Sequence, residues 1–392
     1  MNSYSNEVNI YLDACATTPP HPNVIKKVTQ AQSATWGNPS SLHRLGIESS
    51  TLLEVSRSIF CDKLFALESE IIFTSGATES INLAIIGYCK SVSPGRIVIS
   101  QVEHPSVFSA AKLMESCGWE ILLWPVDTFG HIRLDLLDEV LSPPTKFVSI
   151  VWGQSEIGTT QPINLIGEEC RKRSIVFHTD ATQVLPHGLF NWKSLPIDLL
   201  TASAHKMYGP KGTGLLMKRS DLEIIPLLSG GPQEHYLRSG TEPVALIAGF
   251  AEALLLIDTY LQFEKGYTVF CENKVNYLTN KLRAKIVNDL QLSLTGHSTY
   301  RLPNHLSFIA KDKAQKPIDA RKLVRKLSNL GIFISSGTAC KSGITEDSPV
   351  LKSIAVTKNF RQSGIRLSLG PWIKENELDK IKNLLEQTIN DI

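Results

Sequence analysis

The chain has 392 residues, of which 42% are hydrophobic and 20% charged, a composition ordinary for a globular protein of about two domains. A net charge of +2 favours neither a nucleic acid nor a membrane surface as a partner. No apolar run reaches the roughly 18 residues of a membrane span, and residues 1–9 lack a signal-peptide pattern. Seven cysteines without a Cys-x-x-Cys pair predict no disulfide framework and no metal site, so we expect a reducing cytoplasm.

Strand-like and helical patterns alternate through the first two thirds of the chain. A short strand is expected within residues 9–14, and helical spacing follows over 46–65, behind a turn-rich loop at 37–43. Apolar, β-branched runs then predict buried strands at 70–75, 96–100, 120–126, 146–152, 174–178, 197–204 and 214–218. Helical patterns begin behind Gly76 and lie near 105–117, 133–141 and 163–173. This alternation predicts an α/β fold with a mostly parallel central sheet flanked by helices.

The last third of the chain predicts a smaller α/β sandwich. A helical stretch over about 262–285 is expected to link it to the first part of the chain. Short strands then alternate with helical patterns, the strands at 291–295, 305–309, 331–335 and 365–369 and the helices at 318–329 and 376–389.

Polar residues follow several of the predicted strands at the point where each strand ends. They are Glu103-His104, Gln154-Ser-Glu-Ile-Gly158, His178-Thr-Asp-Ala-Thr-Gln183 and Ser203-Ala-His-Lys206. In a parallel sheet, ligands bind beyond the carboxyl ends of the strands. We therefore expect these side chains to face one crevice.

Lys206 lies between a predicted strand and the glycine-rich turn 209–214. Burial at such a strand exit lowers the pKa of an amine and makes it a nucleophile, although a lone lysine is usually a solvated loop residue. The neighbours of Lys206 suit an aldehyde cofactor. Lys206 would bond to the aldehyde and Asp180 would keep a ring nitrogen protonated, while Gln183 would bond a ring hydroxyl. His104 would stack on the ring and move protons.

A phosphate site is expected where the strand at 70–75 runs into Ser75-Gly76 and a helix begins, because free N–H groups and the helix dipole converge there. The expected ligands are the amides of Gly76 and Ala77 and the side chains of Thr78, Ser203 and His205. Each candidate has an ordinary alternative: Thr78, Asp180 and Gln183 suit helix caps, and His104 suits a satisfied loop histidine. Their joint position at strand ends favours a cofactor site.

The chain resembles the cysteine desulfurases, which are fold type I, pyridoxal-phosphate-dependent enzymes of the class V aminotransferase superfamily. Motifs typical of that family occur in family order over nearly the whole chain. They are Asn9-Ile-Tyr-Leu-Asp-Ala14, Gly37-Asn-Pro-Ser-Ser41, Phe73-Thr-Ser-Gly-Ala-Thr-Glu-Ser80, Glu103-His104, His178-Thr-Asp-Ala-Thr-Gln183, Ser203-Ala-His-Lys206, Tyr208-Gly-Pro-Lys-Gly-Thr-Gly214, Arg238-Ser-Gly-Thr241, Ser335-Ser-Gly-Thr-Ala-Cys340 and Ile365-Arg-Leu-Ser-Leu-Gly370.

The resemblance implies a large domain over residues 15–260 that binds pyridoxal 5'-phosphate. It implies a small domain over 261–392, packed with the N-terminal segment 1–14 and carrying the catalytic cysteine. It also implies a homodimer in which Thr241 reaches the phosphate in the neighbouring subunit. The substrate would be L-cysteine, and a sulfur-acceptor protein such as an iron–sulfur scaffold would be a partner.

The resemblance also assigns residues to the reaction. Arg366 would bind the substrate carboxylate, and Asn38 and Ser155 would be further substrate contacts. Ser155 stands where the family commonly has asparagine, and it would also contact the cofactor. Cys340 would accept the sulfur as a persulfide, with Lys206 and His104 as proton carriers. The residues around Cys340 resemble those of the long-loop group, which includes nitrogen-fixation and housekeeping iron–sulfur enzymes.

Two other functions remain open from the sequence. A sibling enzyme that shares the cofactor but not the persulfide chemistry could be a cysteine or cystine β-lyase or an aminotransferase. A β-lyase would release sulfide and pyruvate without needing Cys340. A nucleotide-binding module would use residues 209–214 as a phosphate loop, but this string lacks the spacing of the P-loop lysine motif. A visible absorbance band separates a pyridoxal enzyme from a nucleotide-binding protein.

Overall fold

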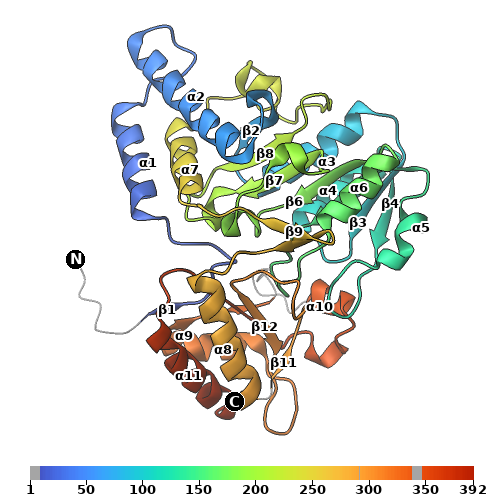
Figure 1. The fold of residues 1–392 in the computed structure, drawn as a ribbon, viewed down its shortest axis with the longest axis vertical. Coiled ribbons are helices and arrows are strands. Elements are labelled where there is room, and N and C mark those ends of the chain that lie inside the picture. The colour runs from blue at the N-terminus through green and yellow to red at the C-terminus, as the bar shows by residue number, and fades with distance from the viewer. Residues whose placement is uncertain (1–8, 291, 338–346) are drawn as a thin grey trace.

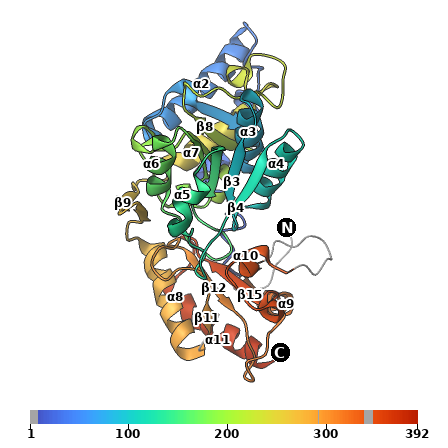
Figure 2. The ribbon, with the colours of Figure 1, turned by 90° about the vertical axis from the view of Figure 1, so that its right-hand side faces the viewer.

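The computed structural model describes residues 9–290, 292–337 and 347–392. The ribbon contains a larger α/β unit built on a seven-stranded sheet and a smaller unit built on a four-stranded sheet (Figure 1). Figure 2 shows the two units stacked along the long axis of the molecule. Within the described part of the chain, no helix has both the length and the hydropathy to cross a membrane.

The seven-stranded sheet confirms the predicted α/β class. Its spatial order is β2 (Ile71–Thr74), β8 (Gly214–Lys218), β7 (Leu199–Ser203), β6 (Val176–Asp180), β5 (Thr145–Val151), β3 (Arg96–Ser100) and β4 (Glu120–Trp124). Strand β8 is antiparallel to both of its neighbours, and the remaining pairs are parallel. The carboxyl ends of β3, β5, β6 and β7 therefore meet at one edge of the sheet.

Helices cover both faces of this sheet, which is why its strands read as continuous apolar runs. One face packs against α3 (Ala77–Ser91) and α4 (Pro105–Glu115). The other packs against α2 (Arg44–Leu64), α6 (Ile163–Lys172) and α7 (Val244–Leu255). Helix α1 (Pro22–Ala34) lies on the outside, against α7, and a short α5 (Leu137–Val140) precedes β5.

The smaller unit has its own core. Its antiparallel sheet has the order β11 (Ser293–Leu294), β12 (His305–Ile309), β15 (Gly364–Ser368) and β14 (Ser335–Ser336). Helices α8 (Lys274–Leu290), α9 (Ala320–Asn329) and α11 (Leu378–Asn390) contribute to the same buried cluster. The N-terminal strand β1 (Ile10–Tyr11) pairs in parallel with β13 (Ile332–Phe333), so the start of the chain belongs to this core.

Helix α10 (Pro349–Ser353) lies where the two units meet, as both views show (Figures 1 and 2). Its residues Val350 and Leu351 share a buried cluster with Val102 and Val151 of the larger unit.

The expected helix over 262–285 is wrong in its first part. Residues 262–269 form a hairpin of β9 (Gln262–Glu264) and β10 (Tyr267–Val269), and α8 starts only at Lys274. Lys265 and Gly266 form its two-residue turn with φ of 51° and 85°. Two successive positive φ angles are typical of the turn that suits the twist of a hairpin.

Candidate active site

Lys206 ends a 3₁₀ turn that directly follows β7, at the strand exit where the sequence predicted it. Gly209 closes this turn with an N–H bond to the carbonyl of Ala204, and a β-carbon at Gly209 would lie 2.7 Å from that oxygen. The Nζ of Lys206 donates hydrogen bonds to the carbonyls of Cys15 at 2.6 Å and Ala16 at 2.7 Å. Burial lowers the pKa of Lys206, which makes its amine easier to deprotonate.

Asp180 is the last residue of β6 and is 6% exposed. Its Oδ1 accepts hydrogen bonds from the N–H of Thr182 at 3.0 Å and from the hydroxyl of Thr201 at 3.4 Å. Gln183 lies in the following turn and donates from Nε2 to the carbonyl of Cys15 at 2.9 Å. Gln183 and Lys206 therefore share one backbone acceptor from the N-terminal segment.

His104 is the N-cap of α4, a role that the sequence did not predict for it. Its Nδ1 accepts from the N–H of Ser106 at 3.2 Å and lies 2.7 Å from the Ser106 hydroxyl. Desolvation lowers the pKa of His104, Asp180 raises it and Lys206 lowers it, so these three groups share one electrostatic environment. At neutral pH the imidazole is uncharged and can accept a proton.

The start of α3 has room for an anion. A β-carbon added at Gly76 would come within 4 Å of only one atom among the described residues beyond its chain neighbours, the Ser203 hydroxyl at 3.9 Å. Ala77 and Thr78 open the helix at this point. His205 lies in the same turn as Lys206, and its Nδ1 is 3.1 Å from the Thr17 hydroxyl. Burial, together with the charge of Lys206, lowers the pKa of His205 to about 4, so it is a neutral hydrogen-bonding group.

Arg366 lies in the middle of β15 and is 7% exposed. Its Nη2 donates to Oδ1 of Asp13 at 2.6 Å, and its Nη1 donates to the carbonyl of Ser155 at 3.2 Å. Its Nε is buried without a partner among the described residues. Ser155 contributes its backbone carbonyl here, and the same carbonyl is also 3.0 Å from Nε2 of His305. Burial lowers the pKa of Arg366, but Cys15 and Asp13 raise it, so that the pKa lies above its ordinary value.

The structure does not bring every predicted residue to this place. Asn38 is exposed in the α1–α2 loop, where its Oδ1 accepts the N–H of Ser40 at 2.9 Å. Thr241 is exposed ahead of α7, in a turn whose Arg238 forms a 3.0 Å ion pair with Glu79 of α3. Cys340 falls outside the described residues.

Sequence reasoning missed the part played by the N-terminal segment. The carbonyls of Cys15 and Ala16 accept from Lys206, and Asp13 pairs with Arg366. A charged residue directly after the apolar run of residues 10–12 was the signal available. A buried ionisable group at the end of a strand usually has a partner.

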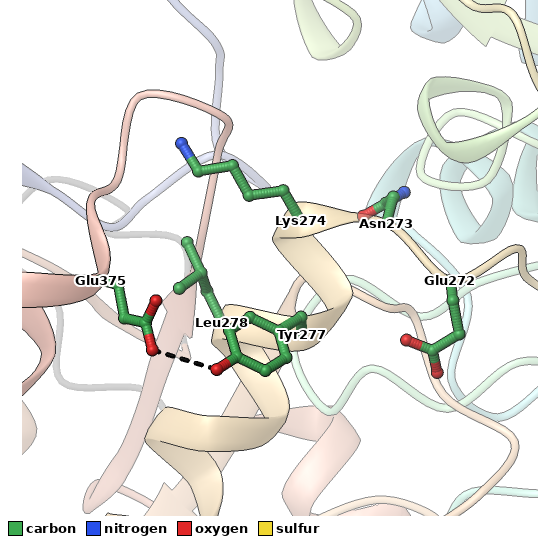
Figure 3. Close-up of a pocket in the computed structure, with 6 residues that line it drawn as sticks. All are labelled: Glu272, Asn273, Lys274, Tyr277, Leu278 and Glu375. Atoms are coloured by element: carbon green, nitrogen blue, oxygen red, sulfur yellow. Dashed lines mark hydrogen bonds between the residues drawn. The ribbon is translucent and has the colours of Figure 1, made fainter.

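A surface hollow at the start of α8 is separate from this cluster (Figure 3). It is lined by Glu272, Asn273, Lys274, Tyr277, Leu278 and Glu375. Tyr277 points toward Glu375, and its hydroxyl donates to Oε1 at 3.0 Å. None of its lining residues is a predicted site residue.

Comparisons with known proteins identify the family of the chain. The aminotransferase class-V family model matches residues 10–381. A cysteine desulfurase IscS of Dictyoglomus turgidum is 35% identical over 385 residues, which cover 98% of this chain and 95% of that protein. A solved NifS-like protein has a TM-score of 0.86 at 30% identity, covering 98% of this chain and 100% of its own. A structure of SspA in complex with cysteine has a TM-score of 0.78 at 30% identity, with coverage of 93% and 100%.

The match extends over nearly the whole chain and includes the segments that carry Lys206, Asp180, His104 and Arg366. The chain therefore belongs to the aminotransferase class-V family and, within it, to the cysteine desulfurases, which depend on pyridoxal 5'-phosphate.

Proposed function

We propose that this protein removes the sulfur of L-cysteine, releases L-alanine and holds the sulfur as a persulfide on Cys340. The observation that supports the proposal is that Lys206, Asp180 and His104 lie at or beyond the carboxyl ends of β7, β6 and β3, at the same edge of the sheet. Desolvation lowers the pKa of both the amine and the imidazole there. A buried amine beside a carboxylate and a neutral imidazole suits proton transfer at an amino acid.

The same group of residues suits pyridoxal phosphate. The open space at Gly76 and the buried hydroxyl of Ser203 suit a phosphate, and the carboxylate of Asp180 suits a protonated ring nitrogen. The residues that would hold the cofactor are Lys206, Ala77, Thr78, His104, Ser155, Asp180, Gln183, Ser203 and His205, with Thr241 from a neighbouring subunit. When bound, the cofactor supplies an aldehyde for the substrate amine and a ring that takes up electrons from the substrate.

Arg366 would bind the substrate carboxylate, and its buried setting supports this role. Its guanidinium now pairs with Asp13 and leaves Nε without a partner among the described residues. A carboxylate accepts two parallel N–H bonds from such a fork. Nζ of Lys206 would move the α-proton of the substrate. Asn38 would contact the substrate only across the dimer interface, in the active site of a neighbouring subunit.

Cys340 would take the sulfur by nucleophilic attack. Its thiolate attacks the sulfur of the substrate, so an S–S bond forms as the Cβ–S bond breaks. The electron pair of the broken bond stays with the β-carbon, which takes up a proton and becomes the methyl group of alanine. His104 is neutral and would accept the thiol proton that must leave before the attack.

The same proposal includes a homodimer, a division into two domains and an acceptor for the persulfide. The protein would act as a cytoplasmic homodimer, with Thr241 of one subunit completing the phosphate site of the other. The cofactor domain would span residues 15–260, and the small domain would span 261–392 together with 1–14. The persulfide would pass to an acceptor protein such as an iron–sulfur scaffold.

The products test the proposal. The purified protein should be yellow, and borohydride should attach the cofactor to the peptide that contains Lys206. Incubation with L-cysteine should yield alanine and an extra sulfur on the Cys340 peptide by mass spectrometry. The Cys340→Ala variant should still change its absorbance when cysteine is added, but should lose turnover.

Two results would overturn it. Pyruvate as the main product, or full turnover by Cys340→Ala, would make the protein a β-lyase. Borohydride trapping on another lysine would remove Lys206 from its role.

A further inference from the structure

Glu156 is a buried acid that neither the motifs nor the proposed chemistry uses. It is 9% exposed and lies in the turn that follows β5. The Gln154 side chain holds this turn, because its Oε1 accepts the N–H of Glu156 and, at 3.1 Å, the N–H of Ile157. Gly158 closes the turn with an N–H bond of 2.9 Å to the carbonyl of Gln154. The backbone that carries the Glu156 carboxylate is therefore fixed.

This carboxylate contacts both ends of one segment of the small unit. The hydroxyl of Ser348, a fully buried residue, donates to Oε1 of Glu156. A β-carbon at Gly337 would lie 2.8 Å from both Cγ and Oε1 of Glu156, so the Gly337 backbone packs directly on the acid. The segment between these two contacts is 338–346, which includes Cys340.

Each end is also joined to a regular element. Gly337 donates its N–H to the carbonyl of Gly364, the first residue of β15, at 3.0 Å. Ser348 is the N-cap of α10, and its Oγ accepts the N–H of Leu351 at 3.0 Å. Glu156, which is far away in sequence, therefore connects the end of a strand with the start of a helix.

The same turn reaches Arg366. The carbonyl of Ser155, the residue before Glu156, accepts a hydrogen bond from the guanidinium at 3.2 Å. Burial raises the pKa of Glu156 to about 7, although the Ser348 hydroxyl and the charge of Arg366 both lower it. One short turn thus contacts the proposed substrate-binding arginine and both ends of the segment with the proposed sulfur acceptor.

We propose that Glu156 is a positioning residue that holds Gly337 and Ser348 beside Arg366 and so sets how often the Cys340 thiol meets the bound substrate. The inference rests on the proposed function, in which Cys340 takes the sulfur. Fixing the ends of a chain segment raises the effective concentration of a group it carries at a nearby site. Glycine at position 337 fits, because any side chain there would collide with the carboxylate.

Four variants test whether the contacts of Glu156 with Gly337 and Ser348 position the Cys340 thiol. Glu156→Ala removes both contacts, and Ser348→Ala removes the hydroxyl that donates to the acid. Glu156→Gln keeps the size and an oxygen acceptor, so it should behave nearly as the wild type. Ser353→Ala is the matched control, since Ser353 lies on the same helix and its hydroxyl bonds the carbonyl of Gln101 at 3.1 Å, away from Glu156.

The first measurement needs no catalysis. Iodoacetamide labels the holoenzyme without substrate, and mass spectrometry compares the labelling rate of Cys340 with that of exposed Cys117. Glu156→Ala and Ser348→Ala release an end of segment 338–346, so the ratio of the Cys340 labelling rate to the Cys117 labelling rate should change about threefold or more. In Glu156→Gln and Ser353→Ala this ratio should change less than about 1.5-fold. An unchanged ratio in both of the first two variants overturns the proposal.

The second measurement separates binding from sulfur transfer. At saturating cysteine, alanine formation should fall about tenfold in Glu156→Ala, with KM changed less than about twofold. A raised KM with an unchanged labelling ratio would instead make Glu156 a support for Arg366 and overturn the proposal. If the labelling ratio shifts but the wild type forms no persulfide, the positioning contact stands and the proposed function fails.

Discussion

Glu103 is a buried carboxyl group whose surroundings favour its protonated form. It is 3% exposed, and its Oε1 accepts the N–H of Val151 at 2.7 Å and the hydroxyl of Ser100 at 2.5 Å. Its Oε2 has no partner among the described residues. Burial is the main cause that raises the pKa of Glu103 to about 8, and the charge of Asp180 contributes to this rise. A neutral acid beside His104 avoids a second negative charge close to Asp180.

Glu103 should make the protein less stable as the pH rises. In the unfolded chain it ionises near its ordinary pKa of about 4.3, whereas in the folded chain it keeps its proton until about pH 8. Unfolding therefore releases a proton between these values, so the free energy of unfolding falls as pH rises through this window. Glu103→Gln should flatten this slope in thermal melts from about pH 5 to about pH 9. The exposed Glu223→Gln is the control, and parallel curves for Glu103→Gln and wild type would contradict the prediction.

Asp13 supplies a negative charge beside the buried guanidinium of Arg366, the group we propose to bind the substrate carboxylate. Asp13→Asn leaves a buried guanidinium without its ion pair, so the melting temperature should fall. A ligand carboxylate can replace that charge. L-alanine should therefore raise the melting temperature of Asp13→Asn more than that of the wild type.

The surface pair of Lys285 and Asp379 provides the control for this prediction. Asp379→Asn should shift the melting temperature only slightly, because exposed pairs contribute about 0–1 kcal/mol. An equal response of wild type and Asp13→Asn to L-alanine would show that Arg366 does not bind the carboxylate.

The turn before Arg238 has an unfavourable backbone that a buried ion pair holds in place. Glu234, His235 and Tyr236 have φ of 45°, 58° and 64°, and each such residue costs roughly 1–2 kcal/mol. The Glu234 carboxylate accepts two hydrogen bonds from Arg57 of α2, at 2.8 and 3.0 Å, and the N–H of Phe73 at 2.8 Å. Helix α2 thus sets the path of the chain toward Thr241.

Glu234→Gln should destabilise the protein strongly. It leaves the buried Arg57 guanidinium with only the more exposed Glu54, at 3.5 Å, as a counter-charge, and breaking a buried pair costs about 3–5 kcal/mol. Urea unfolding should show the loss as a lower midpoint. Glu48→Gln breaks an exposed pair with Arg44 and should cost less than about 1 kcal/mol. Equal midpoints for the two variants would contradict this account.

At the scale of the whole molecule, large apolar side chains are exposed on the α1–α2 arm. Leu42 is 95% exposed, and Ile25, Trp36, Ile47 and Val55 are exposed on the same arm. A groove between the two helices is lined by Ala31, Ile47, Leu52 and Val55, among others. Clusters of this kind mark protein–protein contacts, and a second copy of this chain is the occupant we propose.

If the proposed dimer forms through this groove, Ile47→Glu should make the protein a monomer, because a charge in an apolar interface loses its hydration. Light scattering would give the mass. The monomer should lose activity, since Thr241 of the neighbouring subunit would no longer reach the site. Leu113→Glu, on the exposed face of α4, is the control and should remain a dimer. A fully active monomer would exclude a shared site.

Local patterns were sufficient to predict most strands, because a strand covered on both faces reads as an apolar run. The predicted runs at 96–100, 214–218 and 305–309 coincide with β3, β8 and β12. The sequence pattern at 262–269 predicts a helix, but these residues form a hairpin. A short apolar run fits the period of a helix as well as that of a strand, and the turn at Lys265-Gly266 decides between them.

The sequence by itself determined the α/β class and placed Lys206, Asp180 and His104 at strand ends, because each depends on a short stretch of chain. Only the tertiary structure decided which groups meet across the fold. Asp13 reaches Arg366 over a separation of 353 residues, and Glu156 reaches Ser348 over 192. The first contact forms within the smaller unit, to which the N-terminal segment belongs, and the second joins the two units. Neither partner can be inferred from a short stretch of chain, because a carboxylate is held in such a place only where a distant donor satisfies it.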